Sequence, residues 1–112
     1  MRLKSELWVK AYLRTCASAG VPAVVVRRGD EDAGVVFVKV SRLDGTAALY
    51  GPAPAGLERD SGEPRWSLTV TASDADIETR LAREKNLDFD IWVIEIEDRE
   101  GRHFLEGWLA PE

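Results

Sequence analysis

The stretch Ile91-Trp92-Val93-Ile94-Glu95-Ile96-Glu97 decides the fold that the sequence predicts. Residues that alternate along a β-strand point to opposite faces of the sheet. The even-numbered positions of this stretch are apolar throughout, whereas the odd-numbered positions begin apolar and turn acidic at Glu95 and Glu97. A strand that is apolar on both faces is covered on both sides. The sequence therefore predicts that the start of this strand lies between two layers of packed structure.

Two other segments have the 3.6-residue spacing of helices with one apolar face. The first spans residues 4–19 and ends at Gly20 and Pro22. The second begins after an N-cap at Ser73 and ends near Asn86, a residue that tolerates a left-handed backbone. The predicted inward-facing residues are Trp8, Val9, Tyr12, Leu13, Cys16 and Ala19 on the first helix, and Ile77 and Leu81 on the second.

The remaining strands are predicted at 23–28, 35–43, 46–50, 66–71 and 102–109. Asp44-Gly45 predicts a two-residue hairpin turn, and Arg99-Glu100-Gly101 predicts a three-residue turn. The order α-β-β-β-(β)-α-β-β predicts an α+β fold, with a mixed, mostly antiparallel sheet of five to six strands. Two helices pack on this sheet, and one on each face is a possible arrangement. The unit over 66–97 is a right-handed crossover if its strands are parallel neighbours.

Length and composition indicate one globular domain over residues 1–112, with a Pro/Gly-rich loop at 51–65. A loop of this length inside a compact domain is either mobile or functional. No stretch approaches the length of a membrane span, and the N-terminus lacks the pattern of a signal peptide. The single cysteine rules out an intrachain disulfide, although an intermolecular one stays open. We therefore expect a cytoplasmic protein that does not bind membranes.

Charge is distributed unevenly along this acidic chain, whose net charge is −5. Residues 1–44 carry eight basic and five acidic side chains, whereas residues 45–112 carry seven basic and fifteen acidic ones. An acidic protein gains little from the counterion release that drives nucleic-acid binding, so a nucleic-acid partner is not expected. The first half could still present a basic face.

The residues whose side chains could act in catalysis or bind a metal do not form a recognisable site in this sequence. We expect Cys16 to be a buried, unreactive thiol on the first helix. His103 is expected opposite Glu97 in the last hairpin, as a solvated cross-strand pair. The acidic residues between 88 and 106 and the Asp30-Glu31-Asp32 run do not have the spacing of a calcium-binding loop. We therefore predict no metal, no cofactor and no catalytic residue.

The order of elements also resembles the core of the nuclease superfamily that contains many restriction enzymes. Those enzymes place a carboxylate two residues before a lysine on a strand, where it holds a metal ion. Here the residue two before Lys39 is Phe37, so this triplet is missing. We do not predict a nuclease of this type.

Basic residues in the first half form the better candidate site. If the strands 23–28 and 35–43 pair antiparallel, their basic side chains could converge, and arginine binds carboxylates and phosphates through two parallel hydrogen bonds. The alternative is that these side chains pair with surface acids of the same chain. The candidate binding residues are Arg27, Arg28, Asp30, Lys39, Arg42 and Tyr50.

The sequence resembles a family of short bacterial proteins, the domain-of-unknown-function family 1491, found mainly in alphaproteobacteria. The resemblance implies a single-domain cytoplasmic bacterial protein, and it implies no activity, ligand or catalytic residue. It is carried by Trp8-Val9-Lys10-Ala11-Tyr12-Leu13-Arg14, Val26-Arg27-Arg28-Gly29-Asp30, Phe37-Val38-Lys39-Val40, Arg42-Leu43-Asp44-Gly45, Leu49-Tyr50-Gly51-Pro52-Ala53, Leu81-Ala82-Arg83-Glu84 and Glu95-Ile96-Glu97-Asp98-Arg99.

Two functional hypotheses follow from the sequence. The first is a non-enzymatic binding or protein-interaction module, whose partner is an unknown protein or, through an exposed sheet edge, a second copy of the chain. The second is an enzyme or ligand-binding domain for a phosphorylated or nucleic-acid substrate, which needs the basic and acidic groups to converge in one pocket.

Overall fold

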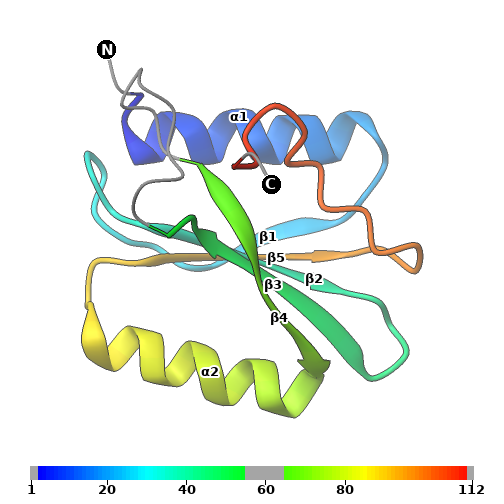
Figure 1. Cartoon of the computed structure of the whole chain (residues 1–112). Coiled ribbons are helices and arrows are strands. Elements are labelled where there is room, and N and C mark those ends of the chain that lie inside the picture. Colours follow the sequence, from blue (N-terminus) through cyan, green and yellow to red (C-terminus); the bar gives the residue numbers. More distant parts are fainter. Residues whose placement is uncertain (1–2, 55–64, 111–112) are drawn as a thin grey trace.

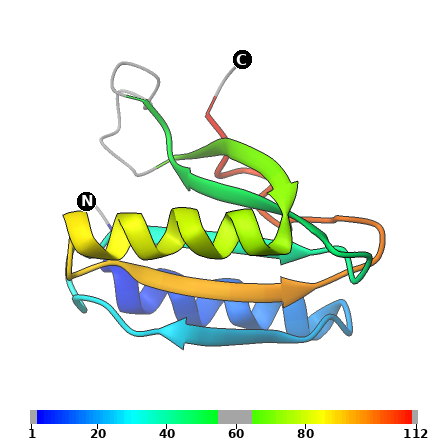
Figure 2. The ribbon, with the colours of Figure 1, turned by 90° about the horizontal axis from the view of Figure 1, so that it is seen from below.

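The computed structural model describes residues 3–54 and 65–110, and it has the predicted α+β fold. Two helices lie on opposite faces of a five-stranded mixed sheet (Figure 1). Figure 2 shows the same layers from the side of the second helix. In chain order the elements are α1 (Ser5–Ser18), β1 (Ala23–Arg27), β2 (Val36–Ser41), β3 (Thr46–Pro52), β4 (Trp66–Ser73), α2 (Asp74–Leu87) and β5 (Trp92–Glu97).

The strands are arranged in the order β1-β5-β2-β3-β4. The β2–β3, β3–β4 and β1–β5 pairs are antiparallel, and only β2 and β5 pair parallel to each other. The last strand of the chain therefore inserts between β1 and β2. The unit over 66–97 does not join neighbouring strands, because β3 and β2 lie between β4 and β5.

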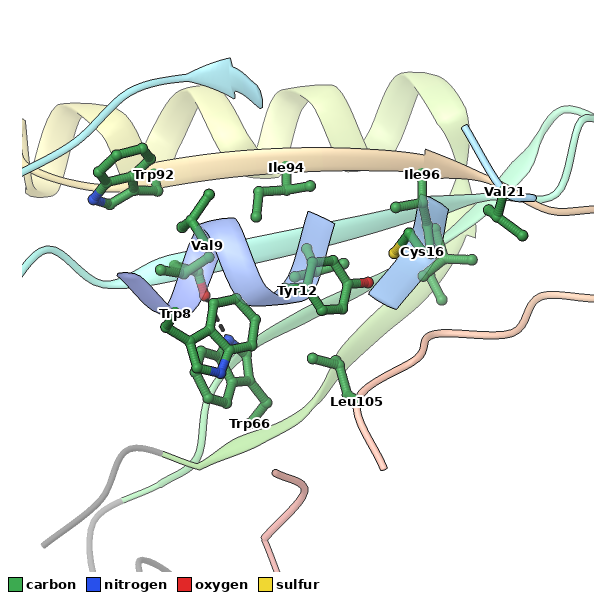
Figure 3. Packing of buried hydrophobic residues seen from close by; sticks show 14 residues of the cluster. Trp8, Val9, Tyr12, Cys16, Val21, Trp66, Trp92, Ile94, Ile96 and Leu105 are labelled. Atoms are coloured by element: carbon green, nitrogen blue, oxygen red, sulfur yellow. Dashed lines mark hydrogen bonds between the residues drawn. The ribbon is translucent and has the colours of Figure 1, made fainter. Parts of the chain in front are cut away.

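One core lies between α1 and the sheet. Trp8, Tyr12 and Cys16 of α1 pack against Trp92, Ile94 and Ile96 of β5, as Figure 3 shows. The predicted inner face of α1 is confirmed except at Ala19, which is exposed at the C-cap. Gly20 ends the helix with a φ of 74°, which a residue with a side chain rarely adopts.

A second core lies between α2 and the other face of the sheet. It contains Ile77 and Leu81 from α2, and Phe37, Leu49 and Val93 from three strands. The prediction that the start of the last strand is covered on both sides is therefore confirmed, because Trp92 and Val93 contribute to different cores. β2 is buried along its whole length for the same reason.

The boundaries of α2 agree with the sequence at both ends, although the helix does not stop in the predicted way. The Ser73 side chain accepts a hydrogen bond from the Asp76 amide, so the predicted N-cap is confirmed. The predicted end near Asn86 is confirmed to within one residue, since the helix ends at Leu87, but Asn86 does not have the left-handed backbone expected of it, and Asp88 is an extended C-cap. The Asp88 amide still donates to the Glu84 carbonyl, so helical hydrogen bonding runs through Asn86.

The hairpin between β2 and β3 is present, but its turn differs from the predicted Asp44-Gly45 turn. Positive φ angles occur at Leu43 (63°) and Gly45 (90°), not at Asp44. Asp44 instead accepts hydrogen bonds at its Oδ1 from the amide and hydroxyl of Thr46. These bonds to Thr46 hold the pKa of the Asp44 carboxyl below its usual value.

The predicted strand at 102–109 is wrong. Both sides of β5 are already occupied, by β1 and β2, so no position is left for a returning neighbour. The segment instead crosses the α1 side of the molecule, where Leu105 is fully buried. Its only bridge among the described residues joins Leu109 to Trp66. Gly101 has the predicted left-handed backbone, with φ 73°.

Two further expectations depended on that strand or on the long loop. His103 does not face Glu97, because its Nδ1 accepts a hydrogen bond from the Leu105 amide, and the Glu97 amide donates to the Pro22 carbonyl. Of the predicted loop at 51–65, the first two residues belong to β3. Residues 55–64 lie outside the described part of the chain.

Candidate functional site

The structure does not bring the predicted basic residues together. The strand at 23–28 pairs with β5, so the predicted pairing with the strand at 35–43 is wrong. β5 therefore separates Arg27 and Arg28 from Lys39 and Arg42. The candidate residues do not converge on one place, and their binding roles stay predictions.

Lys39 lies under α2 in the middle of the sheet. Its side chain is 5% exposed, and its Nζ lies 2.6 Å from Asp74, 2.8 Å from Glu78 and 3.5 Å from Glu95. Burial disfavours the charged ammonium, but the hydrogen bonds to Asp74 and Glu78 outweigh it and raise the pKa of Lys39. A lysine that holds its proton this firmly joins α2 to the sheet and is unsuited to act as a base or nucleophile.

Arg28 and Asp30 organise the loop between β1 and β2. The Arg28 guanidinium lies 3.2 Å from both Glu6 and Glu31, and its carbon lies 5.1 Å from the centre of a Trp92 ring. The hydrogen bond to Glu31 raises the pKa of Arg28. The Asp30 carboxylate caps the turn by accepting from the amides of residues 32 and 33. Both residues therefore have structural contacts within the chain.

Arg42 and Tyr50 lie away from Lys39, which is under α2, and Arg42 is near enough to Tyr50 to favour its ionised form. Arg42 follows β2, and its guanidinium lies against Gly101, where an added Cβ would come within 2.9 Å of the Nε. Tyr50 is half-buried on β3, and its ring centre lies 5.0 Å from that of His103. Burial raises the pKa of Tyr50.

The outer strand β1 carries three consecutive exposed valines. Val24 and Val26 are each 58% exposed, and Val25 is 38% exposed. β1 is the end strand of the sheet and pairs only with β5. Figure 2 shows it at the margin of the sheet, beyond the region covered by α2. We call Ala23–Arg27 with its exposed valines the β1 edge.

Backbone groups of the β1 edge face away from the sheet. The Glu97 amide donates to the Pro22 carbonyl, which makes these two opposite residues a hydrogen-bonded pair. Hydrogen-bonded and non-hydrogen-bonded pairs alternate along an antiparallel ladder. The next hydrogen-bonded pair is therefore Val24 with Glu95, and the amides and carbonyls of Ala23 and Val25 point outward. An extended chain could pair with these groups.

Two large apolar side chains extend this surface beyond the end of β1. Leu87, the last residue of α2, is 74% exposed, and Phe89, in the connection from α2 to β5, is 76% exposed. The Arg27 Nη2 donates to the Phe89 carbonyl over 2.7 Å and so connects this segment to β1. The Arg27 Nε is buried and has no hydrogen-bond partner among the described residues.

Comparison with protein families places the chain in one of them. The model of "Protein of unknown function (DUF1491)" matches residues 3–106. The chain belongs to the DUF1491 family. This confirms the resemblance carried by the sequence blocks, and the family description assigns no function. A comparison with curated proteins gives no significant match.

Solved structures of DUF1491 proteins share this fold. A family member from Caulobacter crescentus CB15, whose crystal structure has a resolution of 1.87 Å, is 38% identical to this chain, with a TM-score of 0.81. That match covers 99% of this chain and 100% of the other. The solution structure of protein Atu0922 from A. tumefaciens gives 38% identity, a TM-score of 0.81, and coverage of 100% and 99%. The NMR structure of a DUF1491 protein from Caulobacter crescentus CB15 gives 40% identity, a TM-score of 0.80, and the same coverage of 100% and 99%.

The β1 edge of this DUF1491 protein was missed in the sequence although its strand was predicted. Three successive valines are compatible with a buried strand or with an exposed edge, so the run alone does not give its position. The informative signal was in the flanks. Pro22 precedes the strand, and Arg27 and Arg28 end it, and proline and charged residues are common devices on edge strands.

This DUF1491 chain also has an open cleft near the start of α1. Its empty space, including the part open to solvent, is about 420 Å³. Its described lining contains no acidic side chain, histidine or cysteine, and offers mainly apolar and aromatic surface. The lining residues are Leu3, Ser5, Trp8, Gly34, Val35, Val36, Pro52, Arg65 and Trp66.

Proposed function

We propose that this protein is a non-enzymatic protein-interaction module that binds an extended polypeptide segment along the β1 edge. The observation that carries the proposal is the exposure of Val24, Val25 and Val26 on an end strand of the sheet. A segment that adds to a sheet edge gains main-chain hydrogen bonds, and its alternate side chains contact the neighbouring surface.

Apolar burial would supply the affinity. Removing apolar surface from water contributes about 25 cal/mol per Å². Val24 and Val26 each keep more than half of their surface exposed in the isolated chain, so both have area to bury against a partner. Small proteins usually protect such an edge or pair it.

The neighbouring Phe89 supports the same surface. Large exposed aromatic side chains are enriched among the residues that contribute most to protein interfaces. Phe89 lies beside the end of β1 through the hydrogen bond from Arg27, so a bound segment that continues past Val26 would reach it. Arg27 and Arg28 of the predicted site then border this surface.

No geometric observation favours the enzymatic alternative. A site for a phosphorylated substrate needs converging basic groups in one pocket. Lys39 is committed to three carboxylates under α2, and Arg28 contacts Glu6 and Glu31 at the other side of β5. We therefore propose only the interaction module.

Site-specific photo-crosslinking in cells tests the proposal. A photoreactive amino acid is placed at position 26 on β1 and, as a matched control, at position 68 on β4. Val26 and Leu68 have similar exposure, at 58% and 53%, and lie on opposite edge strands. We expect discrete protein adducts from position 26, and their loss when Val24→Lys is added, because a charged side chain on the edge opposes strand addition.

Equal adduct patterns at positions 26 and 68 would contradict the proposal. So would adducts at position 26 that persist unchanged with Val24→Lys. Circular dichroism of both substituted proteins checks that the fold is intact in each case.

A further inference from the structure

We infer that the polypeptide segment bound at the β1 edge is basic, with lysine or arginine side chains that lie across Val24 and pair with Glu95 and Glu97. This inference rests on the proposed function and names the chemistry of its partner. A strand added to a sheet edge presents alternate side chains to the two faces of the sheet. The surface on each side of β1 therefore selects a different set of the partner's side chains.

The α2 side of the sheet carries an exposed apolar row on β1 beside an acidic row on β5. Val93 contributes to the core under α2, so Glu95 and Glu97, at alternate positions of the same strand, lie on that side too. Val24 pairs with Glu95, and the Pro22 carbonyl accepts from the Glu97 amide. β1 lies beyond the part of the sheet that α2 covers, as Figure 2 shows. A segment at the edge is thus separated from the two glutamates only by small apolar side chains.

The acidic charge on this side is not balanced within the described chain. Glu97 is exposed and has no ion pair among the described residues. Glu95 lies 3.5 Å from the Lys39 ammonium, but Asp74 and Glu78 lie closer to the same group. Three carboxylates therefore share one buried cation, and Glu97 adds to the excess of negative charge. A basic partner supplies the missing cations.

Lysine and arginine have the length that this geometry requires. Neighbouring strands lie about 4.8 Å apart, so an added strand and β5 are separated by about 10 Å. Long basic side chains lay their aliphatic stems along apolar surface and keep the charged end at a polar site. A stem that lies across Val24 would bury part of its exposed surface and bring the cation to Glu95 or Glu97. An acidic segment would instead place like charges beside these two glutamates.

The far end of β1 has a different character. Arg27 pairs with Val93 and donates to the Phe89 carbonyl, so a cation and an exposed aromatic ring lie at this end. The neighbouring Arg28 is held by two glutamates and lies against the Trp92 ring, which belongs to the core on the α1 side. The basic side chains of the partner therefore belong near the start of β1, and apolar ones near Phe89.

The opposite edge of the sheet lacks this combination. The Trp66 amide of β4 donates to the Trp108 carbonyl, and the Ala110 amide donates to the Trp66 carbonyl, so the C-terminal segment covers the beginning of that edge. The strand next to β4 is β3, which contains no acidic residue. A basic segment added to β4 would therefore find no row of carboxylates one strand further in.

Fluorescence anisotropy with labelled synthetic peptides tests the chemistry. The probe is a peptide of about six residues, the length of a typical strand, that alternates lysine and valine, and its counterpart has glutamate in place of lysine. We expect the lysine peptide to bind the purified chain at least about tenfold more tightly than the glutamate peptide. Its affinity should fall as the salt concentration rises, because the contacts with the glutamates are exposed.

Two charge variants separate the acidic row from the net charge of the protein. Glu97→Lys should weaken binding of the lysine peptide by about fivefold or more, because it replaces the unpaired carboxylate by a like charge. Glu100→Lys makes the same change in net charge on the turn after β5, where the glutamate pairs with Arg102, and should weaken binding less than about twofold. Circular dichroism checks the fold of both variants.

The same two variants test the partner in cells. With the photoreactive amino acid at position 26, Glu97→Lys should remove the specific adducts, whereas Glu100→Lys should leave them in place. A lysine peptide that binds no better than the glutamate peptide, or equal effects of Glu97→Lys and Glu100→Lys, would overturn the inference. Adducts at position 26 that persist with Glu97→Lys would also overturn it and would leave the proposed function standing. Absence of specific adducts at position 26 in the otherwise unchanged chain would overturn the proposed function itself.

Discussion

Lys39 on β2 and Asp74 at the start of α2 form an ion pair of 2.6 Å that joins the most buried strand to the helix that covers it. Glu78 lies one turn further along α2, at 2.8 Å from the same ammonium. Two side chains of the helix therefore share one cation. The position of α2 on the sheet depends on this contact as well as on the apolar core of Ile77 and Leu81.

Replacing Lys39 by methionine should lower the free energy of unfolding by roughly 1–3 kcal/mol. The variant keeps the aliphatic volume but leaves Asp74, Glu78 and Glu95 near one another without their shared cation. These carboxylates are partly exposed, so the loss should stay below that of a fully buried pair. Urea unfolding at neutral pH measures the change.

Single neutralisation of a carboxylate serves as the control. Glu78→Gln should cost less than Lys39→Met, because Lys39 keeps Asp74 and Glu95. If Lys39→Met and Glu78→Gln were equally stable, the ammonium would not be the common contact that holds α2.

Tyr12 should make the protein less stable at alkaline pH. Its hydroxyl donates to the His103 carbonyl over 2.6 Å, and burial raises the pKa of this phenol above its ordinary value of 10.0. The unfolded chain ionises the phenol near pH 10 while the folded chain keeps the proton, so stability is lost as the pH rises. The loss from this group should be about 1.4 kcal/mol at pH 11.

Tyr12→Phe isolates this contribution. At neutral pH the variant should lose about 1 kcal/mol through the missing hydrogen bond. Between pH 8 and pH 11 it should lose less stability than wild type, because the buried phenol that resists ionisation is absent from the variant. Parallel pH dependences for the two proteins would contradict the buried, hydrogen-bonded state of the phenol.

Local patterns were sufficient to predict most elements of the fold. The alternation in the stretch 91–97 identified a strand between two layers. Apolar residues at both its even and its odd positions are by themselves the signal of burial on both faces. The N-cap at Ser73 and the stop at Gly20 were predictable for the same reason, since each depends on a few neighbouring backbone groups.

Strand pairing was the step that local patterns could not supply. β1 pairs with β5 about seventy residues later in the chain, and nothing in the valine run specifies that partner. The predicted strand at 102–109 failed because β5 already has two neighbours, which is a property of the whole sheet. The candidate site shared this weakness. Its basic cluster required β1 to lie beside β2. Because of the same error in pairing, the sequence did not predict that β1 is an exposed end strand.

Trp8 and Trp66 should respond differently to the same substitution. Their rings stack with centres 4.2 Å apart, as Figure 3 shows, and both side chains are buried. The Trp66 Nε1 donates to the Val36 carbonyl over 2.8 Å, whereas the Trp8 Nε1 has no hydrogen-bond partner among the described residues. Trp66→Phe should therefore be less stable than Trp8→Phe by about 1–2 kcal/mol, because it also leaves a buried carbonyl unpaired.

Thermal or urea unfolding of the two variants measures this difference. Both substitutions remove a similar ring volume, so the comparison cancels most of the packing loss. Equal destabilisation would show that the Trp66 hydrogen bond contributes nothing net to stability.

Gly29 should not tolerate a side chain, although its backbone conformation does not require glycine. An added Cβ would clash with the Asp90 carbonyl oxygen and come within 2.7 Å of the Trp92 ring. The backbone of the β1–β2 loop approaches the start of β5 there, and the Asp30 amide donates to the same Asp90 carbonyl over 3.0 Å. Gly29→Ala should cost about 2 kcal/mol or more, since overpacking shifts backbone on both sides.

Gly20→Ala is the informative comparison for this prediction. Gly20 has a φ of 74°, but a Cβ added there would meet open space, so alanine should cost only about 1 kcal/mol of backbone strain. Chemical unfolding of both variants ranks the two effects. A Gly29→Ala protein as stable as Gly20→Ala would contradict the close approach of this loop to β5.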